Sequence, residues 1–347
     1  MLTDRLVLVR PDDWHLHLRD GALMNAVLAP TARVFGRGMI MPNLKPPVTT
    51  SAGAAAYRQR IVAARPAGSD FQPLMALYLT QDTDPDDLEA GVQDGVVHAV
   101  KFYPAGATTN SEAGVTELGR SRAVLERLEK LGVPLLVHGE VTTESVDIFD
   151  REARFLDQVL EPLLREHAGL RVVVEHATTA QAVDFVREHP GRVGCTLTPQ
   201  HLLANRNDML VGGIRPHLYC LPILKRRSHQ RALLAAATSG DPQFFLGTDS
   251  APHVVGTKQN ACGCAGCFSA PTAIELYAAA FEAEGALDKL EAFASLNGPR
   301  FYGLPANAAT ITLERSPQRI PEQFAVPGID DQIVPLFAGR ELQWRVA

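Results

Sequence analysis

Short apolar segments alternate with longer amphipathic segments along most of this 347-residue chain. Eight short segments are rich in apolar and β-branched residues, which is typical of buried strands. They are residues 6–9 running on to 17, 38–42, 73–79, 97–103, 134–138, 171–176, 193–197 and 243–248. Amphipathic segments lie between them and predict helices over residues 22–35, 51–64, 85–95, 115–131, 149–167, 179–189 and 225–239.

Strands that alternate with helices predict parallel pairing through right-handed crossovers. Eight such units suit a closed (β/α)8 TIM barrel. An open doubly wound sheet is the alternative, but the first strand is followed by neither a GxGxxG sequence nor a P-loop lysine motif. We therefore predict one barrel domain over residues 1–347. The segment 308–347 is expected to form a C-terminal extension packed on the barrel.

Composition narrows the class of protein further. The chain has 46% hydrophobic and 21% charged residues and a net charge of −6, which exclude disorder and argue against a nucleic-acid or anionic membrane partner. No apolar run approaches the roughly 20 residues that span a bilayer, and the N-terminal sequence lacks the apolar core of a signal peptide. Five cysteines in a chain of this length do not suggest a disulfide framework, so we expect a cytoplasmic protein.

Residues with metal-ligating side chains stand where five of the predicted strands end. They are His15 and His17, Lys101, His138, His176 and Asp249. In a parallel barrel the C-terminal ends of the strands share one rim, where the chemistry collects. His15 and His17 are two residues apart on a strand, so both point to the same side. Singly, each histidine is better explained as a packed or hydrogen-bonded residue, but together with Asp249 the set predicts a divalent metal site.

Lys101 ends an apolar run, where a buried ammonium group would be costly without a partner. It can pair with a carboxylate or extend out of the barrel. Alternatively, its neutral amine can add carbon dioxide to form a carbamate, whose two oxygens can bridge two metal ions. Nearby divalent ions would favour the neutral amine that this addition needs.

These residues and their flanking motifs resemble the amidohydrolase superfamily with a binuclear metal centre, and most closely the dihydroorotases of the short bacterial type. The motifs are PDDWHLHLRDG, MPNLKPP, KFYPAGATTNSEAGV, VHGE, EHATT, LGTDSAPH and CGCAGCF, between residue 11 and about residue 272. The resemblance implies a (β/α)8 barrel, a homodimer, and the interconversion of N-carbamoyl-L-aspartate and L-dihydroorotate in pyrimidine biosynthesis.

The resemblance also implies a role for each ligand. One zinc ion would be held by His15, His17, Asp249 and carboxylated Lys101, and a second by Lys101, His138 and His176. Iron, cobalt or manganese would suit the same ligands. A hydroxide bridging the ions would be the nucleophile, and Asp249 would be the general base and acid.

Contacts with the substrate are implied for a further group of residues. Arg19, Asn43 and His253 would bind the ring carboxylate together with the backbone amide of Ala265, and Leu221 would bind the ring amide edge through its backbone. His17 and His138 would also contact the substrate. Thr108 and Thr109, in a small and polar segment after the fourth strand, would close over it as a lid.

Other interpretations of the sequence make different predictions. A related cyclic amidase would share the metal ligands, but Arg19 and Asn43 favour a carboxylated ring. Hydantoinase-like and allantoinase-like relatives carry a small β domain built partly from residues ahead of the first two ligands, and with the first ligand at position 15 we expect no room for that segment here. A catalytically inactive assembly subunit would be expected to lack some ligands, whereas all six positions are filled. Cys262, Cys264 and Cys267 offer only three thiols for a separate zinc site, so we expect a loop packed beside the active site.

Overall fold

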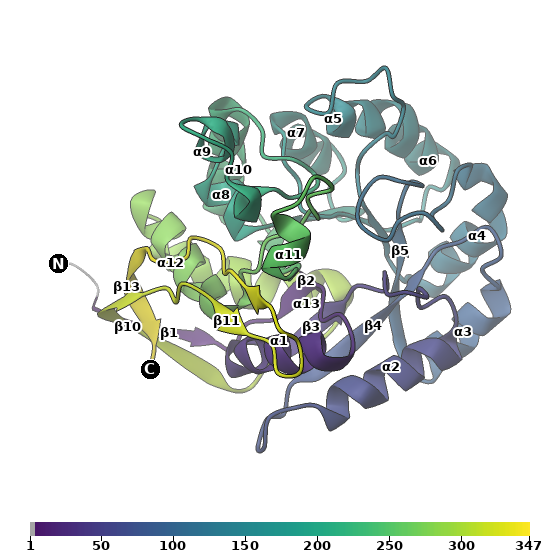
Figure 1. Cartoon of the computed structure of the whole chain (residues 1–347). Helices are drawn as coiled ribbons and strands as arrows, with labels where there is room; N and C mark the ends of the chain where they lie inside the picture. Colours follow the sequence, from purple (N-terminus) through teal and green to yellow (C-terminus); the bar gives the residue numbers. More distant parts are fainter. Residues whose placement is uncertain (1–3) are drawn as a thin grey trace.

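An eight-stranded parallel sheet, closed into a barrel, forms the centre of the computed structural model, which describes residues 4–347 (Figure 1). Each strand pairs with the next one along the chain, which confirms the predicted fold class. The strands are β2 (Asp13–Leu16), β3 (Arg37–Ile40), β4 (Gln72–Tyr78), β5 (Val97–Phe102), β6 (Leu135–Val137), β7 (Val172–Val174), β8 (Val193–Leu197) and β9 (Phe244–Leu246).

The barrel closes between β2 and the residues that follow β9. The amide of Asp249 donates to the carbonyl of His15 at 2.8 Å, and the amide of His17 donates to the carbonyl of Ser250 at 2.9 Å. Asp13 strengthens this seam, because its carboxylate accepts the amide and the hydroxyl of Thr248 at 2.9 and 2.6 Å. The first and last strands are thereby held in register at the end of the barrel where the predicted ligands lie.

Helices surround the sheet (Figure 1). They are α1 (Gly21–Val34), α2 (Ser51–Ala63), α3 (Pro85–Gln93), α4 (Arg122–Leu131), α5 (Arg151–Phe155), α6 (Glu161–Glu166), α7 (Ala180–Glu188), α8 (Pro199–Leu203), α9 (Arg206–Leu210), α10 (Arg227–Ala237), α11 (Val255–Lys258), α12 (Ala273–Ala283) and α13 (Asn297–Tyr302). Within residues 4–347, every helix is too short or too polar to span a lipid bilayer.

Two of the predicted helices differ from the structure in their details. The helix predicted over 115–131 begins regularly only at Arg122, after a 3-10 turn at Leu118–Ser121, and Gly132 ends it in the left-handed conformation at φ 66°. The helix predicted over 149–167 is α5 and α6 joined by one π-helical segment, Leu156–Leu160. Helix α12 was not predicted because it lacks an amphipathic pattern, since eight of its residues are buried.

The first predicted strand is two strands in different sheets, so the prediction of one strand from residue 6 to 17 is wrong. β1 (Arg5–Val9) pairs with β10 (Thr310–Arg319), which in turn pairs with β13 (Glu341–Val346), all antiparallel. Residues ahead of His15 therefore do contribute to a small β layer, contrary to our expectation. Between the two strands lies Pro11, which lacks the amide donor that a continuous ladder would need.

The C-terminal segment packs on the outside of the barrel, as predicted. Its strand β13 lies against α12, and the first and last strands of the described chain, β1 and β13, both belong to this small sheet (Figure 1). Trp344 is fully buried there, and its indole donates to Glu282 Oε2 of α12 at 3.0 Å. Two shorter strands, β11 (Phe324–Ala325) and β12 (Gln332–Ile333), form a hairpin in the part of the chain between β10 and β13.

The alternation of side chains along the strands directs the site residues inward. The barrel interior contains, among others, Ala99 of β5, Leu136 of β6 and Val173 of β7. The residues two positions further along these strands are Lys101, His138 and Glu175. Because side chains two apart on a strand share a face, these three also point toward the barrel axis, one layer nearer the rim.

Candidate active site

A small cavity at the C-terminal end of the barrel, about 20 Å³ in volume, gathers most of the predicted site residues. It is lined by His15, His17, Arg19, Asn43, Tyr103, Thr108, Thr109, His138, His176, Leu221, Asp249, Ala251, Ala265 and Gly266. Two predicted residues are absent from this lining. Lys101 is completely buried, with its amine 5.0 Å from the centre of the Tyr103 ring, and His253 contacts the cavity residue Arg19 instead.

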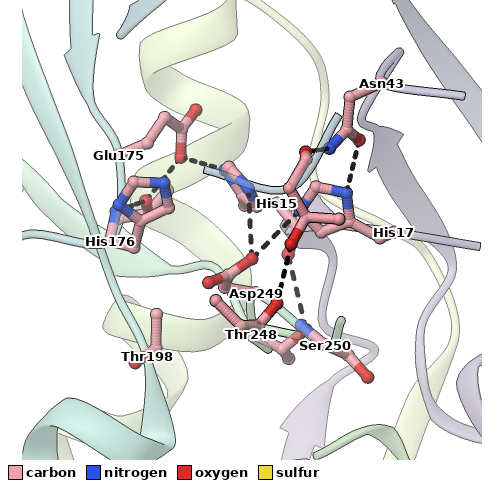
Figure 2. A network of polar contacts seen from close by, with 12 residues as sticks. His15, His17, Asn43, Glu175, His176, Thr198, Thr248, Asp249 and Ser250 are labelled. Atoms are coloured by element: carbon pink, nitrogen blue, oxygen red, sulfur yellow. Dashed lines mark hydrogen bonds and ion pairs between the residues drawn. The ribbon is translucent and has the colours of Figure 1, made fainter. Parts of the chain in front are cut away.

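Three predicted ligands converge on one point beneath this cavity (Figure 2). Asp249 Oδ1 lies 3.4 Å from His15 Nε2 and 3.1 Å from His17 Nε2. One ligand atom from each of the three residues lies within 4.8 Å of the others, and all three residues are buried. Among residues 4–347, this is the one group of at least three histidine, cysteine or acidic side chains with the geometry of a metal site.

Hydrogen bonds on the opposite side of each ring determine which nitrogen carries the proton. His15 Nδ1 lies 2.8 Å from Glu175 Oε2, and His17 Nδ1 lies 2.8 Å from Asn43 Oδ1. Both partners are acceptors, so each neutral imidazole carries its proton on Nδ1 and directs the lone pair of Nε2 toward Asp249. Two lone pairs and a carboxylate oxygen facing one another would repel unless a cation lay between them. The donor chemistry therefore fits a divalent metal ion.

Burial keeps the histidines in the neutral form that binds metal. It lowers the pKa of His15 and that of His176 well below the usual value, and it lowers the pKa of His17. Burial by itself raises the pKa of Asp249, but its close contacts with His17 and His15 outweigh burial, so the pKa is lowered overall. The carboxylate is therefore ionised at neutral pH.

His138 and His176 extend the cluster away from Asp249. The ring of His176 lies 4.8 Å from that of His15 and 4.9 Å from that of His138, measured between centroids. Neither His176 Nδ1 nor Lys101 Nζ has a hydrogen-bond partner among residues 4–347, although both atoms are buried. Burial lowers the pKa of Lys101 to about 8. Such unpartnered donors and acceptors fit a second metal ion and a carbamate.

The backbone is strained at two of these positions. His176 has a φ of 41° and Asp249 a φ of 43°, in the left-handed region that residues with a Cβ rarely adopt. Both follow the end of a barrel strand, and hydrogen bonds hold each of them. The amide of His176 donates to Thr196 Oγ1 at 2.7 Å, and the amide of Asp249 closes the barrel seam. Strain of this kind concentrates at functional sites.

Of the three polar side chains predicted to bind a carboxylate, two are in contact with each other and two line the cavity. Arg19 Nη2 lies 2.9 Å from His253 Nε2, and Arg19 Nε donates to the carbonyl of Pro252 at 3.2 Å. Burial lowers the pKa of Arg19 and also lowers that of His253, to about 2, so His253 is neutral beside the guanidinium. Asn43, which lines the same cavity, presents its carbonyl oxygen to His17.

The segment that contains Thr108 and Thr109 lies across the cavity. The side-chain amide of Asn43 donates to the backbone carbonyl of Thr109 at 3.0 Å. The side-chain amide of Asn110 donates to the backbone carbonyl of Asn43 at 3.1 Å. The Thr109 hydroxyl also reaches the carbonyl of Ala265 at 3.5 Å. These contacts connect the segment to two residues predicted to bind substrate, and they explain why the cavity is small.

Sequence reasoning missed three buried residues that contact the predicted ligands. Glu140 lies 2.8 Å from His138 and Glu175 lies 2.8 Å from His15, while Tyr103 covers Lys101. Two of them had a sequence signal, since Glu140 follows His138 by two residues and Glu175 directly precedes His176. An acidic residue beside a candidate ligand is a common outer partner of a metal-binding histidine.

Comparison with known proteins agrees with this geometry. The model of the Amidohydrolase family matches residues 8–315. A dihydroorotase of Alkalilimnicola ehrlichii is 62% identical and one of Ralstonia nicotianae is 60% identical, each over 99% of both chains. The crystal structure of dihydroorotase from Saccharomyces cerevisiae in complex with 5-fluoroorotic acid has a TM-score of 0.92 and 32% identity, covering 99% of both chains. The chain therefore belongs to the amidohydrolase family and, within it, to the dihydroorotases.

Proposed function

We propose that this chain is a zinc-dependent dihydroorotase that interconverts N-carbamoyl-L-aspartate and L-dihydroorotate in pyrimidine biosynthesis. The observation that carries the proposal is the convergence of His15, His17 and Asp249 on one point, beside a buried and unpartnered Lys101. Relatives about 60% identical over nearly the whole chain are named dihydroorotases, which supports the same reaction here.

The donor set supports two zinc ions joined by a modified lysine. His15, His17 and Asp249 would hold one ion and His138 and His176 the other, with carboxylated Lys101 between them. The buried ammonium of Lys101 would first lose one proton, and the neutral amine would then add carbon dioxide and release a second proton. The two steps together convert a costly buried cation into an anionic ligand. When bound, the ions would lower the pKa of the attacking water and polarise the substrate carbonyl.

The chain's own residues would bind the substrate and move the proton. Arg19 would hold the ring carboxylate through two hydrogen bonds, with Asn43, His253 and the amide of Ala265 completing the contact. The carboxylate of Asp249 would accept a proton from the attacking water and deliver it to the leaving ring nitrogen. Ring closure would reverse these steps, with Asp249 taking the nitrogen proton.

The remaining predicted contacts would orient and enclose the ring. The backbone of Leu221 would bind the ring amide edge, and His17 and His138 would contact the substrate beside the ions. Thr108 and Thr109 would close over it and exclude water, a role that their contacts across the cavity support.

A substrate panel with purified protein tests the proposal. The protein, supplied with zinc and bicarbonate, should convert dihydroorotate and carbamoyl-aspartate into each other, as followed by chromatography. Hydantoin and dihydrouracil are controls, because they present the cyclic amide without the carboxylate, and Asp249→Asn gives the background rate. Metal-loaded protein that leaves both carboxylated compounds unchanged would refute the function. A preference for the uncharged rings would assign the chain to another cyclic amidase.

We further propose that the chain is a homodimer, as the family resemblance implies. Light scattering coupled to size-exclusion chromatography should give twice the chain mass of 37.6 kDa. A mass equal to that of one chain would refute it.

A further inference from the structure

Two buried glutamates each form a hydrogen bond with one histidine of the site. We propose that Glu175 and Glu140 are positioning residues, each of which fixes the orientation and the proton position of one metal-binding histidine. Glu175 would orient His15 for the first metal site, and Glu140 would orient His138 for the second. This inference rests on the proposed function, because it assumes that the histidines bind metal.

The bond between Glu175 and His15 has a defined direction. Thr196 Oγ1 accepts the amide of His176 at 2.7 Å, so its own proton is free to go to Glu175 Oε2, which lies 2.5 Å away. Glu175 Oε2 therefore acts as an acceptor, and the proton of the 2.8 Å contact with His15 resides on Nδ1. Figure 2 shows the ring of His15 between Glu175 and Asp249. Only His15 Nε2 is left to bind a cation.

Glu140 contacts the other ring nitrogen of its histidine partner. Glu140 Oε2 lies 2.8 Å from Nε2 of His138, whereas Glu175 contacts Nδ1 of His15. A carboxylate on Nε2 keeps the proton there, so Nδ1 of His138 retains its lone pair and would be the nitrogen that binds a metal ion. The two glutamates thus select different nitrogens on two histidines from two different strands, β2 and the end of β6.

Both glutamates have a buried carboxylate that the fold pairs incompletely. Oε1 of Glu140 and Oε1 of Glu175 have no hydrogen-bond partner in the described part of the chain, and both residues are at most 2% exposed. Glu152 offers a contrast, since its two oxygens accept bonds from the amide and hydroxyl of Thr178 and from the hydroxyl of Thr179. An incompletely paired carboxylate destabilises the fold unless a nearby cation compensates its charge.

Zinc binding to purified variants tests the inference. Glu175→Gln and Glu140→Gln keep the size of the side chain and an acceptor oxygen but remove the charge, whereas Glu175→Leu and Glu140→Leu remove the acceptor. Zinc affinity is measured on metal-free protein in competition with a chelator, and Co²⁺ absorption reports the coordination of each site. Glu275→Gln is the matched control, because Glu275 is equally buried and also has one oxygen, Oε2, without a partner in the described part of the chain, but it pairs with Arg33 outside the barrel, at 3.0 Å.

We expect each Gln variant to weaken one of the two zinc sites about 10- to 100-fold and to alter its Co²⁺ spectrum. The Leu variants should weaken that site further, and Glu275→Gln should bind zinc like wild type. Denaturant unfolding of metal-free Glu140→Gln should show no loss of stability, because a poorly paired buried charge has been removed. Glu175→Gln also removes the carboxylate that favours the charged form of Lys101, so zinc affinity is the readout for that variant.

Two results would overturn the inference. One is wild-type zinc affinity at both sites in all four variants. The other is a loss of metal-free stability in the Gln variants without a change in zinc affinity, which would assign the glutamates to folding. A wild-type protein that binds no zinc or leaves dihydroorotate unchanged would instead refute the proposed function, so the two failures are distinguishable.

Discussion

Replacing Lys101 by methionine should stabilise the metal-free protein at neutral pH and change how its stability depends on pH. The amine is completely buried without a partner among residues 4–347, and burial lowers its pKa from 10.5 to about 8. In the unfolded chain the same amine binds its proton more strongly. The folded state is therefore penalised below pH 8, and the penalty is relieved as the pH rises from 8 to 10.5.

The size of the penalty follows from the two pKa values. A difference of about 2.5 pKa units corresponds to about 3 kcal/mol at pH 7, at about 1.36 kcal/mol per unit. Near pH 10 the amine is neutral in the folded state and partly neutral in the unfolded state, so less than about 1 kcal/mol of the penalty remains. Methionine has a similar length and no charge, so Lys101→Met should remove the whole free-energy penalty of burying the ammonium group.

Denaturant unfolding of both proteins checks this. Wild type and variant are stripped of metal, kept free of carbon dioxide to prevent carbamate formation, and unfolded at several pH values between 7 and 10. The variant should be more stable by about 3 kcal/mol at pH 7, and this advantage should shrink toward zero at pH 10. Titrating groups distant from Lys101 affect both proteins alike, so the difference reports Lys101 together with its charged neighbours Glu175 and Asp249. A difference that does not change with pH would refute the reasoning.

Four further substitutions give independent tests. Lys101→Ala should lose most bound zinc, with partial recovery by short carboxylic acids; full zinc content measured by elemental analysis would contradict the bridging role. Asp249→Asn should fold normally but lower kcat at least 10²- to 10⁴-fold, as expected for loss of a general base, and retained turnover would exclude that role. Arg19→Lys should raise KM for dihydroorotate about 10-fold or more, because the two-pronged contact is lost; an unchanged KM would exclude the contact. Gly298→Ala should lower the unfolding free energy by about 1–3 kcal/mol, because the new Cβ would overlap the buried ring of Trp14, and an unchanged denaturation midpoint would show that the ring moves aside.

The sequence could predict the barrel because strand and helix periods differ and each is dictated locally. It could also predict which residues reach the rim, since parallel strands end on one side and side chains alternate along each of them. Lys101 and His138 follow the interior residues Ala99 and Leu136 by two positions, so the pattern alone directs them to the axis. For this reason the ligand set could be proposed from one chain.

Only the tertiary structure decided how the side chains pair. The break between β1 and β2 depends on a partner strand that lies 300 residues away, so the local pattern reads as one continuous strand. The proton positions on His15 and His138 depend on Glu175 and Glu140, and the closure over the cavity depends on contacts of Thr109 with Asn43 and Ala265. Such contacts are specified by distance and direction in space, which residue spacing along the chain does not encode.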